Sequence, residues 1–75
     1  MEKALILITL KMEYSSNLKE QIKALPGILD VDLIYGPYDA YAIVETETKE
    51  ELRDLVMKIR EVFGVHLTLT CNVLP

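Results

Sequence analysis

Two runs of this chain are apolar on both faces of an extended strand, and they constrain the fold more than any other feature. The first covers residues 4–10 and is built from alanine, leucine and isoleucine with one threonine, while the second covers residues 40–44. A strand without a polar face belongs in the middle of a sheet that is covered on both sides. We therefore expect two central strands, from Lys3 to Lys11 and from Asp39 to about Thr46.

A further strand is expected immediately before the second of these runs. Residues 28–35 alternate, with one apolar face and one mixed face that carries Asp30 and Asp32. Such a strand suits a sheet edge, where charged side chains discourage pairing with other chains. Gly36 and Pro37 then predict a sharp reversal, so that the two strands form a hairpin.

Two helices are expected between the strands. The first begins near Asn17, where Asn17 or a neighbouring serine can cap it and Asn17 with Glu20 resembles a capping box, and it ends at Pro26-Gly27. The second begins at a Thr48–Glu51 capping box and ends at Gly64. Its apolar stripe consists of Leu52, Leu55, Val56, Ile59 and Phe63, and its wet face includes Asp54 and Lys58 as a favourable pair four residues apart.

The last strand is expected from Val65 to about Leu74, with Pro75 closing the chain. Its apolar residues occupy the odd-numbered positions and alternate with His66, Thr68, Thr70 and Asn72. We interpret the odd-numbered face as the inward one, which makes Cys71 a small buried hydrophobe. The threonines are then expected on the opposite, open face of the sheet.

The resulting order of strand, helix, strand, strand, helix, strand predicts the ferredoxin-like, split βαβ α+β fold as a single domain over residues 1–75. Right-handed crossovers place the first and third strands at the centre of a four-stranded antiparallel sheet, with both helices on one face. The other face would expose apolar side chains at its centre. We therefore expect a face-to-face homodimer or a larger ring.

Composition excludes several classes of function. The chain is acidic, with a net charge of −4, and it contains no basic run, so direct DNA binding is not expected. One cysteine excludes an internal disulfide and fits a reducing compartment. His66 is the only histidine and has no companion ligands for a metal. The start shows no signal peptide and its apolar run is too short to cross a membrane, so we expect a cytoplasmic protein.

Nearly the whole chain resembles the effector-binding domain of the Lrp/AsnC transcription regulators, also called the regulation of amino-acid metabolism (RAM) domain. The resemblance is carried by the first apolar strand, by the Leu-Pro-Gly-Ile of residues 25–28, by the Tyr-Gly-Pro-Tyr-Asp of residues 35–39, and by the Thr-x-Thr of residues 68–70. Full-length family members carry a helix-turn-helix domain before this region. Here the chain starts in the first strand, so a stand-alone RAM protein is expected.

The resemblance implies a function and a site. Dimers of the family associate into octamers or related rings, including decamer-like ones, and small effectors, usually amino acids, bind between dimers near the hairpin. No other cofactor is implied, and a possible partner is a helix-turn-helix regulator of the same family. The binding residues that the resemblance implies are Gly36, Pro37, Tyr38, Asp39, Ala40, Thr68 and Thr70.

Other interpretations stay open at this point. Glycine, proline and aspartate are ordinary turn residues, and threonine is a common strand former, so these residues could be purely structural. A small oligomeric enzyme of the same fold is an alternative, in which Tyr38 and Asp39 would handle a proton, although no nucleophile–base pair or phosphate loop is visible. A purely structural assembly protein is another.

Overall fold

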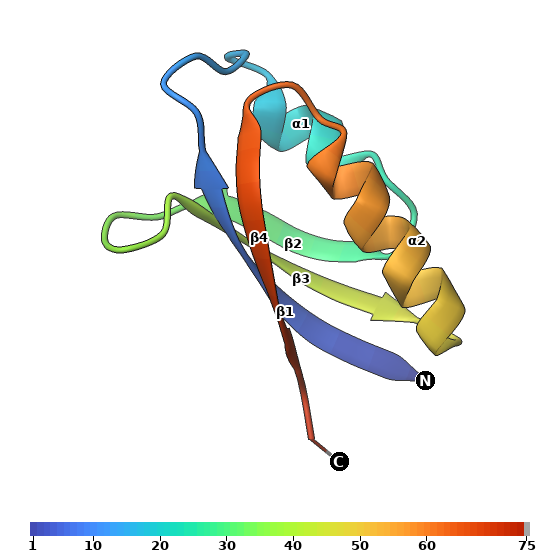
Figure 1. Ribbon diagram of the computed structural model, residues 1–75. Coiled ribbons are helices and arrows are strands. Elements are labelled where there is room, and N and C mark those ends of the chain that lie inside the picture. Colours follow the sequence, from blue (N-terminus) through green and yellow to red (C-terminus); the bar gives the residue numbers. More distant parts are fainter. Residues whose placement is uncertain (75) are drawn as a thin grey trace.

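The computed structural model describes residues 1–74 and confirms the expected order of elements (Figure 1). Pro75 lies outside the described residues. The strands are β1 (Glu2–Leu10), β2 (Ile28–Leu33), β3 (Ala40–Thr46) and β4 (Val65–Asn72), and the helices are α1 (Leu18–Lys23) and α2 (Lys49–Arg60).

The four strands form one antiparallel sheet in the order β2-β3-β1-β4, so the two runs without a polar face are the central strands, as predicted. Both helices lie on the same face of this sheet (Figure 1). The core between the two layers is completely apolar in its buried side chains. It consists of Ala4, Ile6, Ile8, Leu18, Ile22, Val31, Ala40, Ala42, Val44, Leu52, Leu55, Ile59 and Val65.

The two helices begin in different ways. The Thr48 hydroxyl accepts a hydrogen bond from the Glu51 amide at 3.1 Å, and the Glu51 carboxylate accepts one from the Thr48 amide at 3.1 Å. This is the predicted capping box. Asn17 stands at the N-cap of α1 but makes no capping bond, and its Oδ1 accepts instead from the Ser15 hydroxyl and from the Gln21 side chain, the latter at 3.0 Å. The expected capping box at Asn17 is therefore wrong.

The loop between β1 and α1 crosses the turn between α2 and β4 at Gly64. The Lys11 amide donates to the Gly64 carbonyl at 2.7 Å. Gly64 has a φ of 99°, and a Cβ at this position would lie 2.2 Å from the Cβ of Tyr14. Only glycine fits here without displacing the loop.

The structure corrects the expected faces of β4. Ile6 and Ile8 point to the helices, and their partners across the ladder are Thr70 and Thr68. The threonines therefore lie on the helix side of the sheet, while Leu67, Leu69 and Cys71 lie on the open face, where Cys71 is exposed. Strict alternation fixes two faces of a strand without saying which face the helices cover, and the inference chose the wrong one.

Three smaller expectations are also wrong. Phe63 is 64% exposed, because α2 ends at Arg60 and the following turn takes Phe63 out of the helical stripe. Tyr35 is fully exposed, because β2 ends at Leu33. Asp54 and Lys58 form no ion pair, and the one ion pair within residues 1–74 joins Lys19 to Asp32 at 3.3 Å.

Candidate functional site

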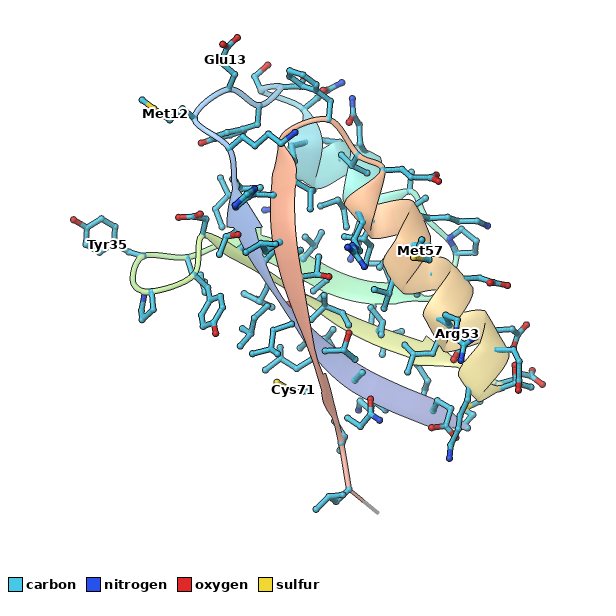
Figure 2. All side chains as sticks on the ribbon, in the orientation of Figure 1. Met12, Glu13, Tyr35, Arg53, Met57 and Cys71 are labelled. Carbon is cyan, nitrogen blue, oxygen red and sulfur yellow. The ribbon has the colours of Figure 1, made fainter. Side chains whose placement is uncertain are left out.

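The loop between β2 and β3, residues 34–39, projects from one end of the sheet. Figure 2 shows Tyr35 at its outer side, pointing into solvent. Gly36 has a φ of 148°, which favours glycine, and an added Cβ would meet no atom within 4 Å. The glycine is therefore required by the backbone conformation and leaves open space beside the loop.

Asp39 fixes the base of this loop to the central strand. Its Oδ2 accepts a hydrogen bond from the Leu10 amide at 2.7 Å, and its own amide donates to the Ile8 carbonyl at 2.9 Å. The Ile34 amide donates to the Asp39 carbonyl at 2.9 Å and closes the hairpin. The carboxylate thus has a structural role that links segments 29 residues apart, and its second oxygen has no hydrogen-bond donor among residues 1–74.

The tip of the loop presents backbone donors. Within residues 1–74, the amides of Gly36 and Tyr38 donate to no acceptor, and Pro37 between them has no amide hydrogen. Tyr38 itself is half-buried. Adjacent unpaired amides are suited to an anionic group such as a carboxylate.

The seven residues implied by the family resemblance do not converge within one copy. Gly36, Pro37, Tyr38 and Asp39 share the loop, whereas the side chain of Ala40 is completely buried in the core. Ile8 of β1 pairs with Thr68 of β4 on one side and with Ala40 of β3 on the other. The central strand β1 therefore separates Thr68 from β3 and the loop that precedes it. Thr70 lies one row further from the loop.

A hollow of about 380 Å³ lies between the loop and the end of β1, and Asp39 contributes to its wall. Most of its lining was not apparent from the sequence, and it consists of Leu10, Lys11, Met12, Tyr14, Leu33, Ile34 and Asp39. The flexible side chain of Met12 and the aromatic side chain of Tyr14 follow β1, and both are exposed. These two apolar residues in an expected loop were the only feature of the sequence that could have indicated a binding surface here.

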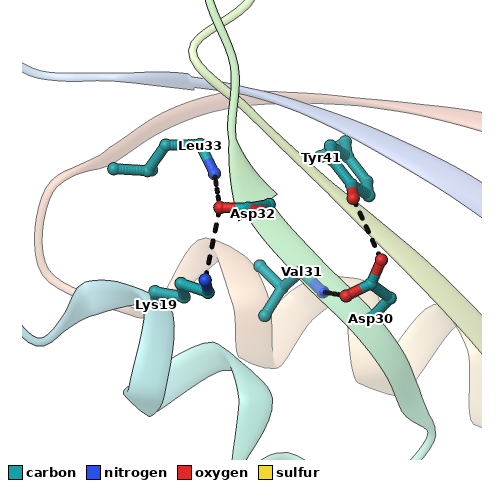
Figure 3. A network of polar contacts seen from close by, with 6 residues as sticks. All are labelled: Lys19, Asp30, Val31, Asp32, Leu33 and Tyr41. Atoms are coloured by element: carbon teal, nitrogen blue, oxygen red, sulfur yellow. Dashed lines mark hydrogen bonds and ion pairs between the residues drawn. The ribbon is translucent and has the colours of Figure 1, made fainter.

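A polar network covers β2 and its neighbours (Figure 3). The Tyr41 hydroxyl donates to Asp30 at 3.0 Å, and this bond, which favours the protonated phenol, raises the pKa of Tyr41. The Leu33 amide donates to Asp32 at 2.9 Å. That bond, followed by the Lys19 ammonium, lowers the pKa of Asp32. From the sequence, the two aspartates were expected only to protect the sheet edge.

The open face of the sheet is apolar across three strands. The exposed fractions of Leu67 and Leu69 on β4 are 56% and 48%, and Leu69 is opposite Leu7 of β1. Leu7 is in turn opposite Tyr41 of β3. We call this surface the open-face patch, and it comprises Leu5, Leu7, Tyr41, Ile43, Leu67, Leu69 and Cys71.

Metal-binding clusters and membrane-spanning helices are both absent from the described part of the chain. Residues 1–74 contain no group of three or more histidine, cysteine, aspartate or glutamate side chains arranged to hold a metal ion. Neither helix in this range has the length and apolar character needed to cross a membrane.

Residues 3–74 match the family described as the Lrp/AsnC ligand binding domain. The homocitrate synthase of Sulfurisphaera tokodaii is 37% identical over 71 residues, which are 91% of this chain and 15% of that enzyme. The chain thus spans only a small part of this curated relative.

Solved structures share the fold. The protein TTHA0845 from Thermus thermophilus is 33% identical, with a TM-score of 0.88 over 100% of this chain and 95% of the other. The transcriptional regulator NMB0573 of Neisseria meningitidis, solved as a complex with L-Met, has a TM-score of 0.82 at 15% identity, over 99% of this chain and 50% of its own. Because the family match extends over almost every residue of the fold described above, the chain belongs to the Lrp/AsnC ligand-binding domain family.

Proposed function

We propose that the protein is a regulatory module that binds an amino acid at the loop of residues 34–39 and transmits occupancy through its assembly. The observation that carries the proposal is the match of residues 3–74 to a ligand-binding domain, combined with a loop that offers unpaired amides beside a carboxylate. The L-Met complex of the structural neighbour NMB0573 supports an amino acid as the class of ligand.

The chemistry of the loop suits both charged ends of an amino acid. The amides of Gly36 and Tyr38 would donate to the α-carboxylate, and the free Oδ1 of Asp39 would accept from the α-ammonium in a charge-assisted hydrogen bond. Thr68 and Thr70 lie on another part of the same copy. Their hydroxyls would reach a ligand only from a neighbouring copy, which makes the complete site an interfacial one.

We further propose a homodimer formed through the open-face patch, with dimers joining into an octamer-like or decamer-like ring. Exposed leucines on β4 beside an apolar centre leave a contiguous apolar surface that a single copy does not cover. Sedimentation velocity tests this directly, with Leu69→Asp as the variant. The side chain is already half-exposed, so the variant should fold but sediment as a smaller species, and unchanged sedimentation would contradict the proposed face.

Two variants of Asp39 separate ligand recognition from folding. Asparagine keeps an oxygen that accepts from the Leu10 amide but removes the negative charge, whereas alanine removes both. Asp39→Asn should therefore retain the wild-type melting temperature and lose the response to amino acids. Asp39→Ala should lose the response and also about 1 kcal/mol of stability.

The assay is a thermal-shift panel with the common amino acids at neutral pH. A ligand at a hundred times its dissociation constant stabilises the folded state by about 2.7 kcal/mol, which raises the melting temperature of a domain of this size by roughly 10 °C or more. A selective rise for the wild type that is absent in Asp39→Asn is the expected result. No rise with any amino acid, or an equal rise in both proteins, would refute the assignment.

Two kinds of protein are candidates for the partner that the module regulates. One is a helix-turn-helix regulator of the same family, which would co-assemble with this chain and change its control of transcription. The other is an enzyme, because a homocitrate synthase contains a region 37% identical to this chain. Ligand-dependent retention of either purified partner on the immobilised chain would distinguish the two, and retention of neither would favour a module that acts alone.

A further inference from the structure

One end of the inner face of the sheet has no helix over it. Leu33 of β2 is opposite Ala40, whose side chain is completely buried in the core, so Leu33 also lies on the helix side of the sheet. Its side chain is nevertheless 45% exposed. Leu33 borders the hollow of about 380 Å³ beside Asp39, and none of the residues that line this hollow belongs to α1 or α2.

The hollow continues the apolar core of the domain. Leu10 follows the completely buried Ile8 by two residues along β1, packs against the core and also lines the hollow. Besides Leu33, three further apolar side chains line it and are exposed: Met12, Tyr14 and Ile34. Figure 2 shows Met12 extending from the loop after β1. A concave surface with this lining is typical of a site for an apolar group.

The hollow also carries two charges of opposite sign. Asp39 uses one carboxylate oxygen to accept from the Leu10 amide at 2.7 Å, and its other oxygen has no donor within residues 1–74. Lys11 lines the hollow and forms no ion pair with any described residue. The carboxylate suits the ammonium group of a ligand, whereas the lysine disfavours a second positive charge on that ligand.

We propose that this hollow is the subsite for the side chain of the bound amino acid, and that the ligand has a large apolar side chain. With the α-ammonium group at the free oxygen of Asp39, the side chain of the ligand would extend along Leu33 toward Met12 and Tyr14. The inference rests on the amino-acid site proposed above. It adds the class of ligand and names Leu33 as a residue that selects it.

Other classes of amino acid fit this surface less well. A basic side chain would face the Lys11 ammonium, while the free oxygen of Asp39 is already taken by the α-ammonium group. An acidic side chain would lose water against apolar walls, which disfavours a charged group. A side chain as small as that of alanine would leave most of the apolar wall in contact with water.

Isothermal titration calorimetry of the full chain with single amino acids tests the class of ligand. Leucine, methionine or phenylalanine should bind most tightly, and alanine, glutamate and lysine should bind at least about tenfold more weakly. Tightest binding of a small or charged amino acid that is lost in Asp39→Asn would refute the subsite and leave the proposed function intact. Binding of no amino acid would refute both.

Two matched substitutions on β2 locate the subsite. Leu33 and Leu29 are 45% and 48% exposed, so phenylalanine at either position should leave the protein folded, but only Leu33 lines the hollow. In Leu33→Phe the added ring would occupy space that a large ligand needs, and the preference for leucine over alanine should fall by about fivefold or more. Leu29→Phe should keep this preference within about twofold. Equal effects of the two substitutions, or an unchanged preference in Leu33→Phe, would overturn the proposal.

Methyl resonances in nuclear magnetic resonance spectra show where the ligand side chain lies. Saturating leucine should shift the methyl groups of Leu33, Ile34 and Met12, whereas saturating alanine should shift them much less. The methyl groups of Leu29, outside the hollow, serve as the control and should stay unchanged with both ligands. Leucine binding that leaves the methyl groups of Leu33 and Ile34 unshifted would contradict the subsite.

Discussion

Replacing Gly64 by alanine should destabilise the protein far more than the same change at Gly36. Both glycines have positive φ values, 99° and 148°, so an alanine at either site incurs backbone strain of about 1–2 kcal/mol. At Gly64 the new Cβ would also lie 2.2 Å from the Tyr14 Cβ and 2.8 Å from its Cα. At Gly36 it would meet nothing within 4 Å.

The steric overlap at Gly64 adds a second cost. The Cα and Cβ of Tyr14 are fixed by the backbone and cannot rotate away as the end of a side chain can, so the loop that carries Tyr14 must move. Overpacking of this kind costs about 1–3 kcal/mol. The total for Gly64→Ala is then about 2–5 kcal/mol, out of the roughly 5–15 kcal/mol that stabilises a typical domain. For a domain of this size, each kcal/mol lowers the melting temperature by roughly 4–8 °C.

Urea and thermal denaturation followed by circular dichroism measure both variants. Gly36→Ala, which shares the strain but not the overlap, should lose only about 1–2 kcal/mol. Equal losses for the two variants would refute the reasoning, because the close approach between Gly64 and Tyr14 would then contribute nothing. A larger loss for Gly36→Ala would contradict it more strongly.

Three further predictions concern polar contacts. Thr48→Ala removes the N-cap of α2 and should cost about 1 kcal/mol in chemical denaturation, whereas a change below about 0.3 kcal/mol would show that the cap is dispensable. Asp32→Asn removes a carboxylate whose pKa is lowered from 3.8 in the folded state. The stability this carboxylate contributes is present above that value and is lost as the pH falls through the lower folded pKa, so acid titrations of melting temperature should be flatter for the variant below about pH 4. The hydrogen bond to Asp30 raises the pKa of Tyr41 from its ordinary value of 10.0, so Tyr41→Phe should remove a late phenol ionisation from an absorbance titration, and an unchanged titration would contradict this.

The topology could be predicted because the strongest patterns in the sequence fix where a strand lies in the whole sheet. A strand that is apolar on both faces can only be central, and this applied to the runs at residues 4–10 and 40–44. The capping box at Thr48 was equally readable, since both partners lie within one turn.

The orientation of β4 could not be predicted from alternation alone. In the folded protein the threonine face lies under the flank of α2, while the leucine face is left open, which is the reverse of what hydrophobicity alone predicts. Neighbouring strands decide such a choice, and their register was not available from the pattern. Phe63 was misplaced for a related reason, because the periodic stripe continues past the point where the helix ends.

The position of the hairpin loop was predicted, whereas its contacts were not. The glycine and proline of the hairpin indicated where the loop would lie. The bond between Asp39 and the Leu10 amide joins residues 29 apart, and no local pattern encodes such a contact. For the same reason the hollow that includes Met12 and Tyr14 became visible only once β1 and the hairpin were placed together.

The bond between Asp39 and Leu10 gives the protein a built-in spectroscopic reporter. The Leu10 amide donates its proton to the Asp39 carboxylate. The chemical shift of this proton therefore depends on the charge and polarisation of the carboxylate. A cation arriving at the free oxygen of Asp39 would draw electron density from the other one and weaken its hold on this proton. One resonance at the end of the central strand would therefore record events in the loop, without any label placed on the loop itself.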